Sequence, residues 1–226
     1  MFYVTALIIV ALGGSGASPH APGAVSAMST YTYVPGKGEL LDLMVDAVYG
    51  EIATAALLGE DWWQRLASIA RANWALLRRH PWLLRLSSST RPVLGPNTMA
   101  KYENELSAID GIPVSEVQLD AVLTLALGHP QYAARMAADA EDAEQRSGIT
   151  DEQWWSGYAV HLQRVMDPRK YPTATRVGGA AGDEHNSAHD PEYVFEFGLQ
   201  LLVDGLRSSS CRSRRRGCWC AAAARR

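Results

Sequence analysis

The sequence "FEFGLQLLVDGL", residues Phe195–Leu206, predicts a helix that is apolar on more than one face. At helical spacing, its apolar side chains and the preceding valine form two stripes, Val194, Phe197 and Leu201, and Phe195, Leu199, Leu202 and Leu206. A surface helix of a monomer buries only one stripe. We therefore expect this helix to pack on its own core and on a second subunit, with full burial inside one monomer as the alternative.

Two glycines in this helix are places where another backbone could approach closely. We expect a homodimer, and the residues expected at its interface are Phe195, Phe197, Gly198, Leu201, Leu202 and Gly205.

Helix start and stop signals run through the rest of the chain. No stretch alternates convincingly between apolar and polar residues, so a sheet is not expected and the fold class is all-α. The expected helices are Lys37 to about Ala56, one capped by Asp61 and ended by His80–Pro81, Pro96 to Gly111, Ser115 to about Arg146 with a break at Gly128–Pro130, one capped by Thr150, and Asp190 to about Arg207.

Three stretches lack these helix signals. Residues 13–26, "GGSGASPHAPGAVS", hold four glycines and two prolines, and an interior proline alone costs a helix about 3 kcal/mol. The loop 178–190 is rich in glycine, and we expect it to be flexible. The tail 208–226 has no apolar periodicity, so we expect it to be disordered.

Charge is unevenly distributed along the chain. The 226 residues include 21 basic and 24 acidic ones, a formal net charge of −3. Six arginines and no acidic residue lie after Arg207, which leaves 15 basic against 24 acidic residues before it, a balance of −9. An acidic body is a poor general binder of nucleic acid. Any DNA contact must therefore come from a small local site or from the tail.

The cysteines and the first residues bear on the compartment. All three cysteines lie in the tail, so the body has no disulfide framework, which favours a cytoplasmic protein. The apolar run Phe2–Leu12 resembles part of an export signal, but no Lys or Arg precedes it and it is too short to span a bilayer. We expect a buried helix there and no membrane partner. The alternative is an exported or membrane-associated all-α protein.

An ordered set of motifs resembles the tetracycline-repressor-like (TetR) family of transcriptional regulators. The stretch "AMSTYTYVPGKGELLDLM", residues 27–44, is similar to the family's recognition helix, the following turn and the lysine that starts the next helix. The segments "HPWLL", "TRPVLGPN", "YENELSAIDGIPVSE", "YPTATRV" and "FEFGLQLLVDGL" resemble its ligand-binding and dimerisation domain. The resemblance covers roughly residues 27–207. It implies a homodimeric repressor that is released from operator DNA by a small molecule.

The resemblance also implies a division of the chain and a set of DNA contacts. The parts are an irregular segment 1–26, a recognition and connecting helix 27–58, a ligand-binding and dimerisation domain 59–207 and the tail 208–226. The residues implied at the DNA are Ser29, Thr30, Tyr31 and Tyr33, at the major groove or flanking phosphates, and Lys37, at a phosphate. For Tyr33, packing against the next helix is an equally good account.

The sequence departs from the family pattern just upstream of this stretch. The family has a first helix and a short second helix there, and this chain has residues 13–26, whose composition suggests a reading-frame slip or a decayed gene segment. Without a helix that crosses the DNA backbone, the recognition helix is not held in place. We therefore expect weak or absent specific DNA binding by this exact chain. The alternative function is a dimeric small-molecule binder that has lost operator binding.

The resemblance places a small-molecule pocket inside the larger domain. Such a pocket is mostly apolar with a few polar groups. The residues expected to line it are Asn73, Trp74, Thr90, Arg91, His129, Tyr132 and Trp155. For His129 the alternative is a kink residue before Pro130, and for each tryptophan it is plain core packing.

A metal site and an enzymatic function are less well supported. The loop residues with suitable groups are Asp183, Glu184, His185, His189 and Asp190, but a mobile, glycine-rich loop seldom makes a preformed site. The sequence has no nucleophile elbow, phosphate loop or carboxylate pair suited to acid–base work. We therefore expect no metal, no cofactor and no catalysis.

Overall fold

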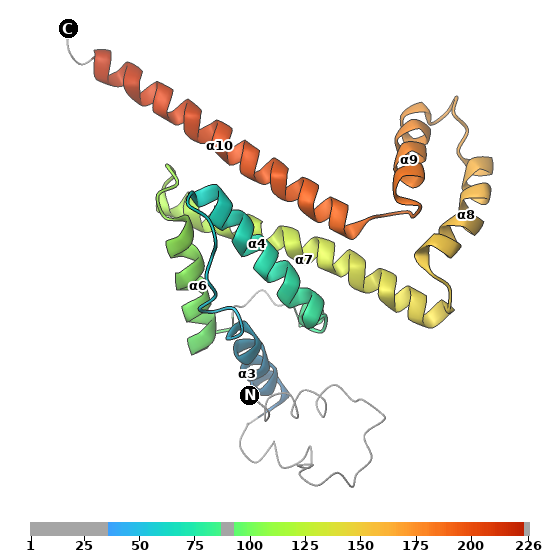
Figure 1. Ribbon diagram of the computed structural model, residues 1–226, viewed down its shortest axis with the longest axis horizontal. Coiled ribbons are helices and arrows are strands. Elements are labelled where there is room, and N and C mark those ends of the chain that lie inside the picture. Colours follow the sequence, from blue (N-terminus) through green and yellow to red (C-terminus); the bar gives the residue numbers. More distant parts are fainter. Residues whose placement is uncertain (1–35, 87–92, 224–226) are drawn as a thin grey trace.

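The computed structural model describes residues 36–86 and 93–223, and of these it describes Gln163 and residues 209–223 by their backbone alone. All regular structure in this described part is helical, as the sequence predicts (Figure 1). The helices are α3 (Lys37–Tyr49), α4 (Trp62–Arg79), α5 (Leu83–Leu86), α6 (Pro96–Ile109), α7 (Glu116–Ser147), α8 (Asp151–Val165), α9 (Pro172–His185) and α10 (Pro191–Ala223).

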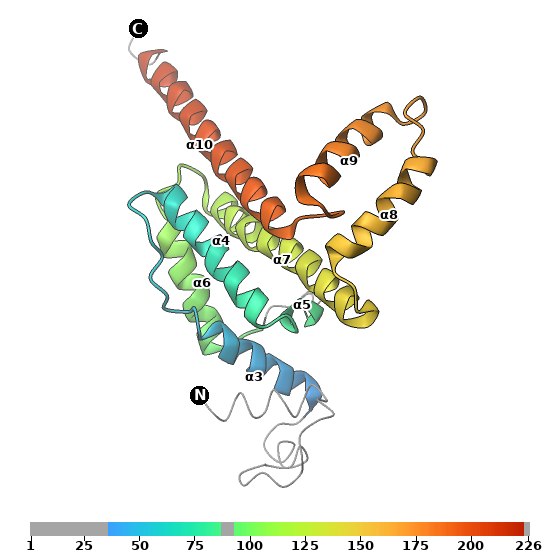
Figure 2. The same cartoon turned by 45° about the vertical axis from the view of Figure 1, so that its right-hand side comes forward.

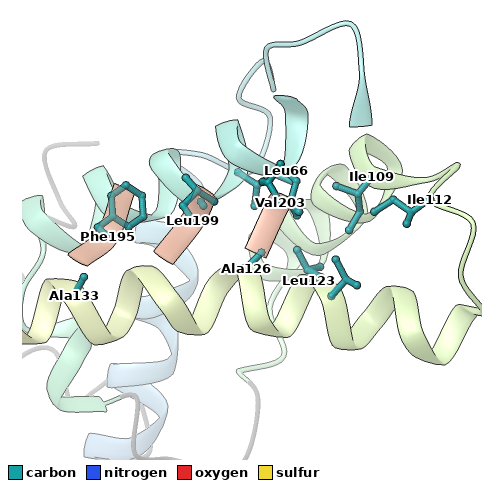
Figure 3. Close-up of a cluster of buried hydrophobic side chains, with 12 residues drawn as sticks. Leu66, Ile109, Ile112, Leu123, Ala126, Ala133, Phe195, Leu199 and Val203 are labelled. Carbon is teal, nitrogen blue, oxygen red and sulfur yellow. The ribbon is translucent and has the colours of Figure 1, made fainter. Parts of the chain in front are cut away.

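A helical body forms around α4, which packs against α6, α7 and α10. α3 lies at one end of this body and packs on α6 (Figure 2). The main core draws on α4, α6, α7 and the first half of α10, and its side chains interlock between these helices (Figure 3). Leu66 and Ile69 of α4 are fully buried, and Phe195 of α10 is 1% exposed. Burying a side chain as large as Phe195 contributes roughly 2–3 kcal/mol.

Several helix starts follow the capping signals read from the sequence. At the start of α7, the Ser115 hydroxyl accepts from the Gln118 backbone N–H at 3.4 Å, and Gln118 Oε1 accepts from the Ser115 backbone N–H at 3.0 Å. Thr150 and Gln153 form the same reciprocal pair at the start of α8. Proline occupies the first position of α6, and Asp190–Pro191 opens α10. These starts are confirmed.

The break predicted at Gly128–Pro130 is wrong. α7 runs through Pro130 without interruption. A proline inside a helix removes one backbone hydrogen bond, here the one to the carbonyl of Ala126. Ala126 and Pro130 are both completely buried, so core packing on this face holds the helix together where the hydrogen bond is missing.

A second departure concerns the segment after α8. The loop 178–190, predicted to be flexible, is helical up to His185, where Asn186 in the left-handed conformation, φ 49°, ends α9. Pro172 suits the first turn of a helix, which favours this start despite the glycines. α8 and α9 form an arm that projects from the body between the end of α7 and the start of α10 (Figures 1 and 2).

The ends of two helices also differ from the sequence prediction. α3 stops at Tyr49 and not near Ala56, because Gly50 follows and the chain enters a series of turns. α10 does not stop near Arg207. Its backbone remains helical to Ala223, through the segment predicted to be disordered. Alanine and arginine are good helix formers, so a lack of apolar periodicity does not exclude a helix.

Candidate functional site

Most of the predicted DNA contacts precede the described part of the chain. Ser29, Thr30, Tyr31 and Tyr33 lie outside the described residues. Lys37 is the first residue of α3 and is exposed. The partial positive charge of a helix N-terminus adds to that of the lysine, an arrangement that suits a phosphate.

One buried carboxylate ties α3 to α6. Asp46 is 7% exposed, and it accepts hydrogen bonds from the backbone N–H and the hydroxyl of Thr98, both at 2.8 Å, and from the side-chain amide of Asn97 at 3.0 Å. Burial by itself would raise the pKa of Asp46, but the hydrogen bonds from Thr98 and Asn97 outweigh it and hold that pKa below its ordinary value. Asp46 is therefore ionised at neutral pH.

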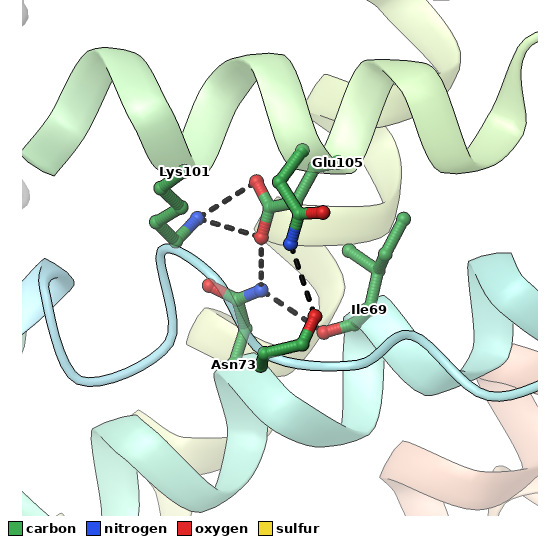
Figure 4. A network of polar contacts seen from close by, with 6 residues as sticks. Ile69, Asn73, Lys101 and Glu105 are labelled. Atoms are coloured by element: carbon green, nitrogen blue, oxygen red, sulfur yellow. Dashed lines mark hydrogen bonds and ion pairs between the residues drawn. The ribbon is translucent and has the colours of Figure 1, made fainter.

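A polar network lies inside the body between α4 and α6 (Figure 4). Lys101 Nζ lies 2.8 Å from both carboxylate oxygens of Glu105, and both residues are buried. The Asn73 side-chain amide donates to Glu105 Oε1 at 2.8 Å and to the Ile69 carbonyl at 2.9 Å. Lys101 also lies 5.2 Å from the ring centroid of Tyr49 on α3. The network therefore links three helices with its charges paired.

The Tyr49 hydroxyl responds to the same surroundings. Burial raises its pKa, and the charge of Glu105 raises it further. Tyr49 is therefore neutral at physiological pH, and its ring serves as a cation–π partner for Lys101.

An aromatic stack joins α4, α10 and α7. The rings of Trp74 and Phe195 are stacked with centroids 4.7 Å apart, and those of Phe195 and His129 are stacked at 5.7 Å. His129 Nε2 lies 2.8 Å from the Phe195 carbonyl oxygen. A Cβ added at Gly198 would overlap the His129 ring and lie 2.6 Å from Nε2. Only glycine at this position allows α10 so close to His129.

The seven residues predicted to line an effector pocket do not lie together in the structure. Trp74 and His129 meet in the stack, whereas Asn73 is committed to the network with α6. Tyr132 is 61% exposed on α7, and Trp155 lies in the arm against Gly182. Thr90 and Arg91 lie outside the described residues. The single lining set expected from the sequence is therefore spread over several places.

A groove of about 550 Å³ runs between α4 and α10. Leu199 and Val203 are among the apolar side chains that line it, and Arg71 and Glu196 lie at its polar side. Arg71 donates to both carboxylate oxygens of Glu196, at 2.9 and 2.7 Å, and these hydrogen bonds lower the pKa of Glu196. Such a surface suits a small molecule with apolar and polar parts.

Sequence reasoning did not find this groove. Arg71 and Glu196 are separated by 125 positions, and no local pattern marks them as partners. Trp63, also in its lining, has the Arg207 guanidinium 4.7 Å from its ring centroid. The tryptophans of α4 were the only sequence feature that pointed to a binding surface here, and they do not show which residues of α10 lie opposite them.

The six residues predicted at a dimer interface lie on two faces of α10. Phe195 is 1% exposed in the chain's own core, so its assignment to a subunit interface is wrong, and Leu202 also packs against this core. Gly198 faces His129 of the same chain. Phe197 and Leu201 are 54% and 58% exposed, and Gly205 is exposed on the same helix. Full burial of both stripes inside one monomer is thus not observed.

Among the residues whose side chains the structure describes, no group of three or more potential metal ligands gathers. His185 Nδ1 lies 3.5 Å from Asp190 Oδ2. The described helices also include none that is long and apolar enough to cross a membrane.

Comparison with known proteins identifies relatives of the chain. Residues 55–209 match the family model of the tetracyclin repressor-like C-terminal domain. The chain is 39% identical over 180 residues to the HTH-type transcriptional repressor DrrR1 of Streptomyces coeruleorubidus, a match that covers 79% of this chain and 64% of that protein. It is 36% identical over 83 residues to an HTH-type transcriptional regulator of Saccharopolyspora erythraea, covering 37% of this chain and 35% of that one. The chain thus spans less than two thirds of the length of these curated relatives.

The fold is also similar to that of a solved structure. The TetR transcriptional regulator SCO7222 of Streptomyces coelicolor matches with a TM-score of 0.54 at 21% sequence identity, over 82% of this chain and 83% of that one. At this identity the likeness concerns the fold, and it agrees with the all-α architecture described above.

Proposed function

This chain belongs to the TetR family of transcriptional regulators, and we propose that it is a ligand-responsive repressor that acts as a homodimer on operator DNA in the cytoplasm. The observation that carries this proposal is the family match over residues 55–209, joined to 39% identity with a named repressor over 180 residues. The relatives are named as regulators of transcription, which supports a function other than catalysis.

For the DNA contact we propose Ser29, Thr30, Tyr31, Tyr33 and Lys37. Lys37 supports this assignment because it is exposed at the N-terminus of α3, where the helix end adds to its charge. Hydroxyl groups and a lysine at a helix start are common contacts to DNA phosphates.

For the effector we propose a site in the body beside the Trp74–Phe195–His129 stack. Aromatic rings such as Trp74 suit stacking with a small aromatic molecule. Asn73 stays a proposed contact of the effector, with its amide nitrogen already donating to Glu105 and Ile69. Thr90 and Arg91, which lie outside the described residues, stay proposed contacts of this effector. Tyr132 and Trp155, proposed on the same grounds, lie apart from the stack, on the exposed face of α7 and in the arm.

For the homodimer we propose the face of α10 that the chain's own core leaves uncovered. Tyr193, Phe197 and Leu201 follow one another at intervals of four residues and are each more than half exposed. The Tyr193 and Phe197 rings stack with centroids 5.9 Å apart, which makes a preformed apolar surface. Leu125 and Tyr132 of the adjacent α7 are exposed to a similar extent. An exposed apolar surface of this kind is typical of a subunit interface.

The second candidate function is a dimeric small-molecule binder without operator binding. The composition of residues 13–26 favours it, since four glycines and two prolines do not suit the helices that hold a recognition helix on DNA.

One experiment separates the two candidates. The purified chain is titrated into fluorescent DNA from its own upstream intergenic region across a series of salt concentrations, and anisotropy is recorded. A matched variant carries a standard family helix pair in place of residues 13–26. Specific binding by the native chain supports the repressor. Specific binding by the variant alone supports the binder that has lost its operator, and binding by neither contradicts a DNA-binding function.

A further inference from the structure

The first turn of α6 is capped by a residue from another helix. The N-terminal N–H groups of a helix have no partner within it, and the N-cap side chain usually accepts from them. In α6 the N-cap is Gly95, which has no side chain, and Pro96 follows it. Asp46 of α3 takes this role, because its carboxylate accepts from the backbone N–H of Thr98 at 2.8 Å and of Asn97 at 3.4 Å.

Gly95 leaves the space that this arrangement needs. A Cβ added there would overlap Asp46 Oδ1 and Cγ and would lie 2.8 Å from Asp46 Cβ. The backbone at Gly95, φ −133° and ψ 162°, is extended, and any residue adopts it. The glycine is therefore required by the close approach of Asp46 and not by the backbone conformation.

A second contact repeats the attachment one turn further along both helices. Tyr49 of α3 lies beneath Lys101 of α6, with Nζ 5.2 Å from the ring centroid. Lys101 is in turn held by Glu105. Within the described chain, α3 and α6 thus pack side by side. Val45 and Val48 of α3 also pack in a second apolar cluster with side chains of α4, α5 and α7, among them Leu76 and Leu83. Apolar packing of this kind has no preferred direction, so the two polar contacts with α6 are the directional part of the attachment.

We propose that Asp46, as the cap that α3 supplies to α6, is the positioning residue that fixes the direction in which α3 carries the preceding DNA-binding segment away from the body. The claim that Asp46 fixes the direction of α3 concerns only α3, α6 and the contact between them. The consequence for operator affinity rests on the proposed repressor function.

If Asp46 only stabilised α6, its removal would have different effects. A helix cap that only stabilises α6 would, when removed, lower the denaturant midpoint and leave the native direction of α3 unchanged. A positioning residue would also change that direction in the native state. The decisive measurement is therefore a distance between α3 and the body, together with an unfolding curve.

The test uses full-length protein with spin labels at two exposed positions, Asp42→Cys on α3 and Glu144→Cys on α7. The three native cysteines are replaced by serine, and unlabelled protein is added in excess so that distances within one chain dominate. In this background we compare Asp46→Ala, which removes the carboxylate, and Gly95→Ala, which displaces it. The matched control is Gly38→Ala on α3, where an added Cβ meets nothing within 4 Å.

We expect the label–label distance to shift or broaden in Asp46→Ala and Gly95→Ala, and to stay unchanged in Gly38→Ala. Thr98→Ser, which keeps the hydroxyl donor, should keep the original distance. An unchanged distance in both test variants, with a lowered denaturant midpoint, would overturn the proposal and leave Asp46 a stabilising cap only.

The DNA measurement is separate. If the parent protein binds its upstream DNA, the two test variants should bind about tenfold more weakly, similar to the loss of one specific base-pair contact. Unchanged affinity despite a shifted distance would overturn the operator part of the proposal. If the parent protein does not bind DNA specifically, the repressor function fails, while the label distances still decide the role of Asp46.

Discussion

Gly198 sets how closely α10 approaches α7 at His129. Gly198→Ala should destabilise the protein by about 1–3 kcal/mol, since the new Cβ would overlap the His129 ring and break its hydrogen bond to Phe195. The matched control is Gly205→Ala in the same helix, where a Cβ meets nothing within 4 Å. The control should be stabilising by up to about 1 kcal/mol. Urea unfolding followed by circular dichroism measures both, and equal effects would contradict the steric account.

The buried pair of Lys101 and Glu105 leads to a second prediction. Lys101→Met leaves the Glu105 carboxylate buried without its cation, and should lower the free energy of unfolding by about 3–5 kcal/mol. The double variant Lys101→Met, Glu105→Leu should recover most of that loss, because it removes both charges. A double variant as unstable as the single one would show that the unpaired charge is not the cause. Denaturant titration of the three proteins decides between these outcomes.

Hydrogen bonds between buried polar residues on different helices could largely not be predicted from the sequence. Asn73 was expected to contact a ligand, but its side-chain amide donates to Glu105, which lies 32 positions later in the sequence. The hydrogen-bond partner of Asp46, Thr98, lies 52 positions later. A polar residue on an apolar helix face signals that some partner exists. It does not say whether the partner is a ligand or another helix, since that depends on how the helices pack.

Among the elements, the arm formed by α8 and α9 depends on a close contact between its two helices. A Cβ at Gly182 would overlap Trp155 Cζ2 and lie 3.1 Å from Cε2. Gly182→Ala should therefore separate the two helices and raise amide hydrogen exchange throughout the arm, while exchange in the body stays unchanged. Gly179→Ala, where the added Cβ meets nothing within 4 Å, is the matched control. Exchange that is unchanged by Gly182→Ala would show that this contact does not hold the arm.

Helix starts were predicted well because their signals are local. Ser115 and Thr150 each meet a glutamine three positions later, and this spacing is visible in the sequence. α9 was missed because its glycines argue against a helix, and the end of α10 was placed too early. Helix propensity and packing decide such cases together, and packing is not visible in one sequence.

At the scale of the whole molecule, the charge of the tail should govern non-specific binding to DNA. Removing residues 208–226 changes the formal net charge from −3 to −9, because six arginines are lost. The truncated chain should bind random DNA more weakly, with a smaller dependence of the binding constant on salt. A full-length variant with these six arginines replaced by glutamine is the control and should behave in the same way. Unchanged binding in both would exclude the tail as a DNA contact.

The place of α10 in the core has a consequence for synthesis of the chain. Phe195, Leu199 and Val203 complete the main core, yet they follow every other helix that contributes to it. While the ribosome is still making the earlier helices, the apolar faces of α4 and α7 that will receive α10 are exposed, and such surfaces aggregate. The body can close only after these late residues leave the exit tunnel. A premature stop before Phe195 would therefore release a chain that depends on chaperones, even though seven of its eight described helices were intact.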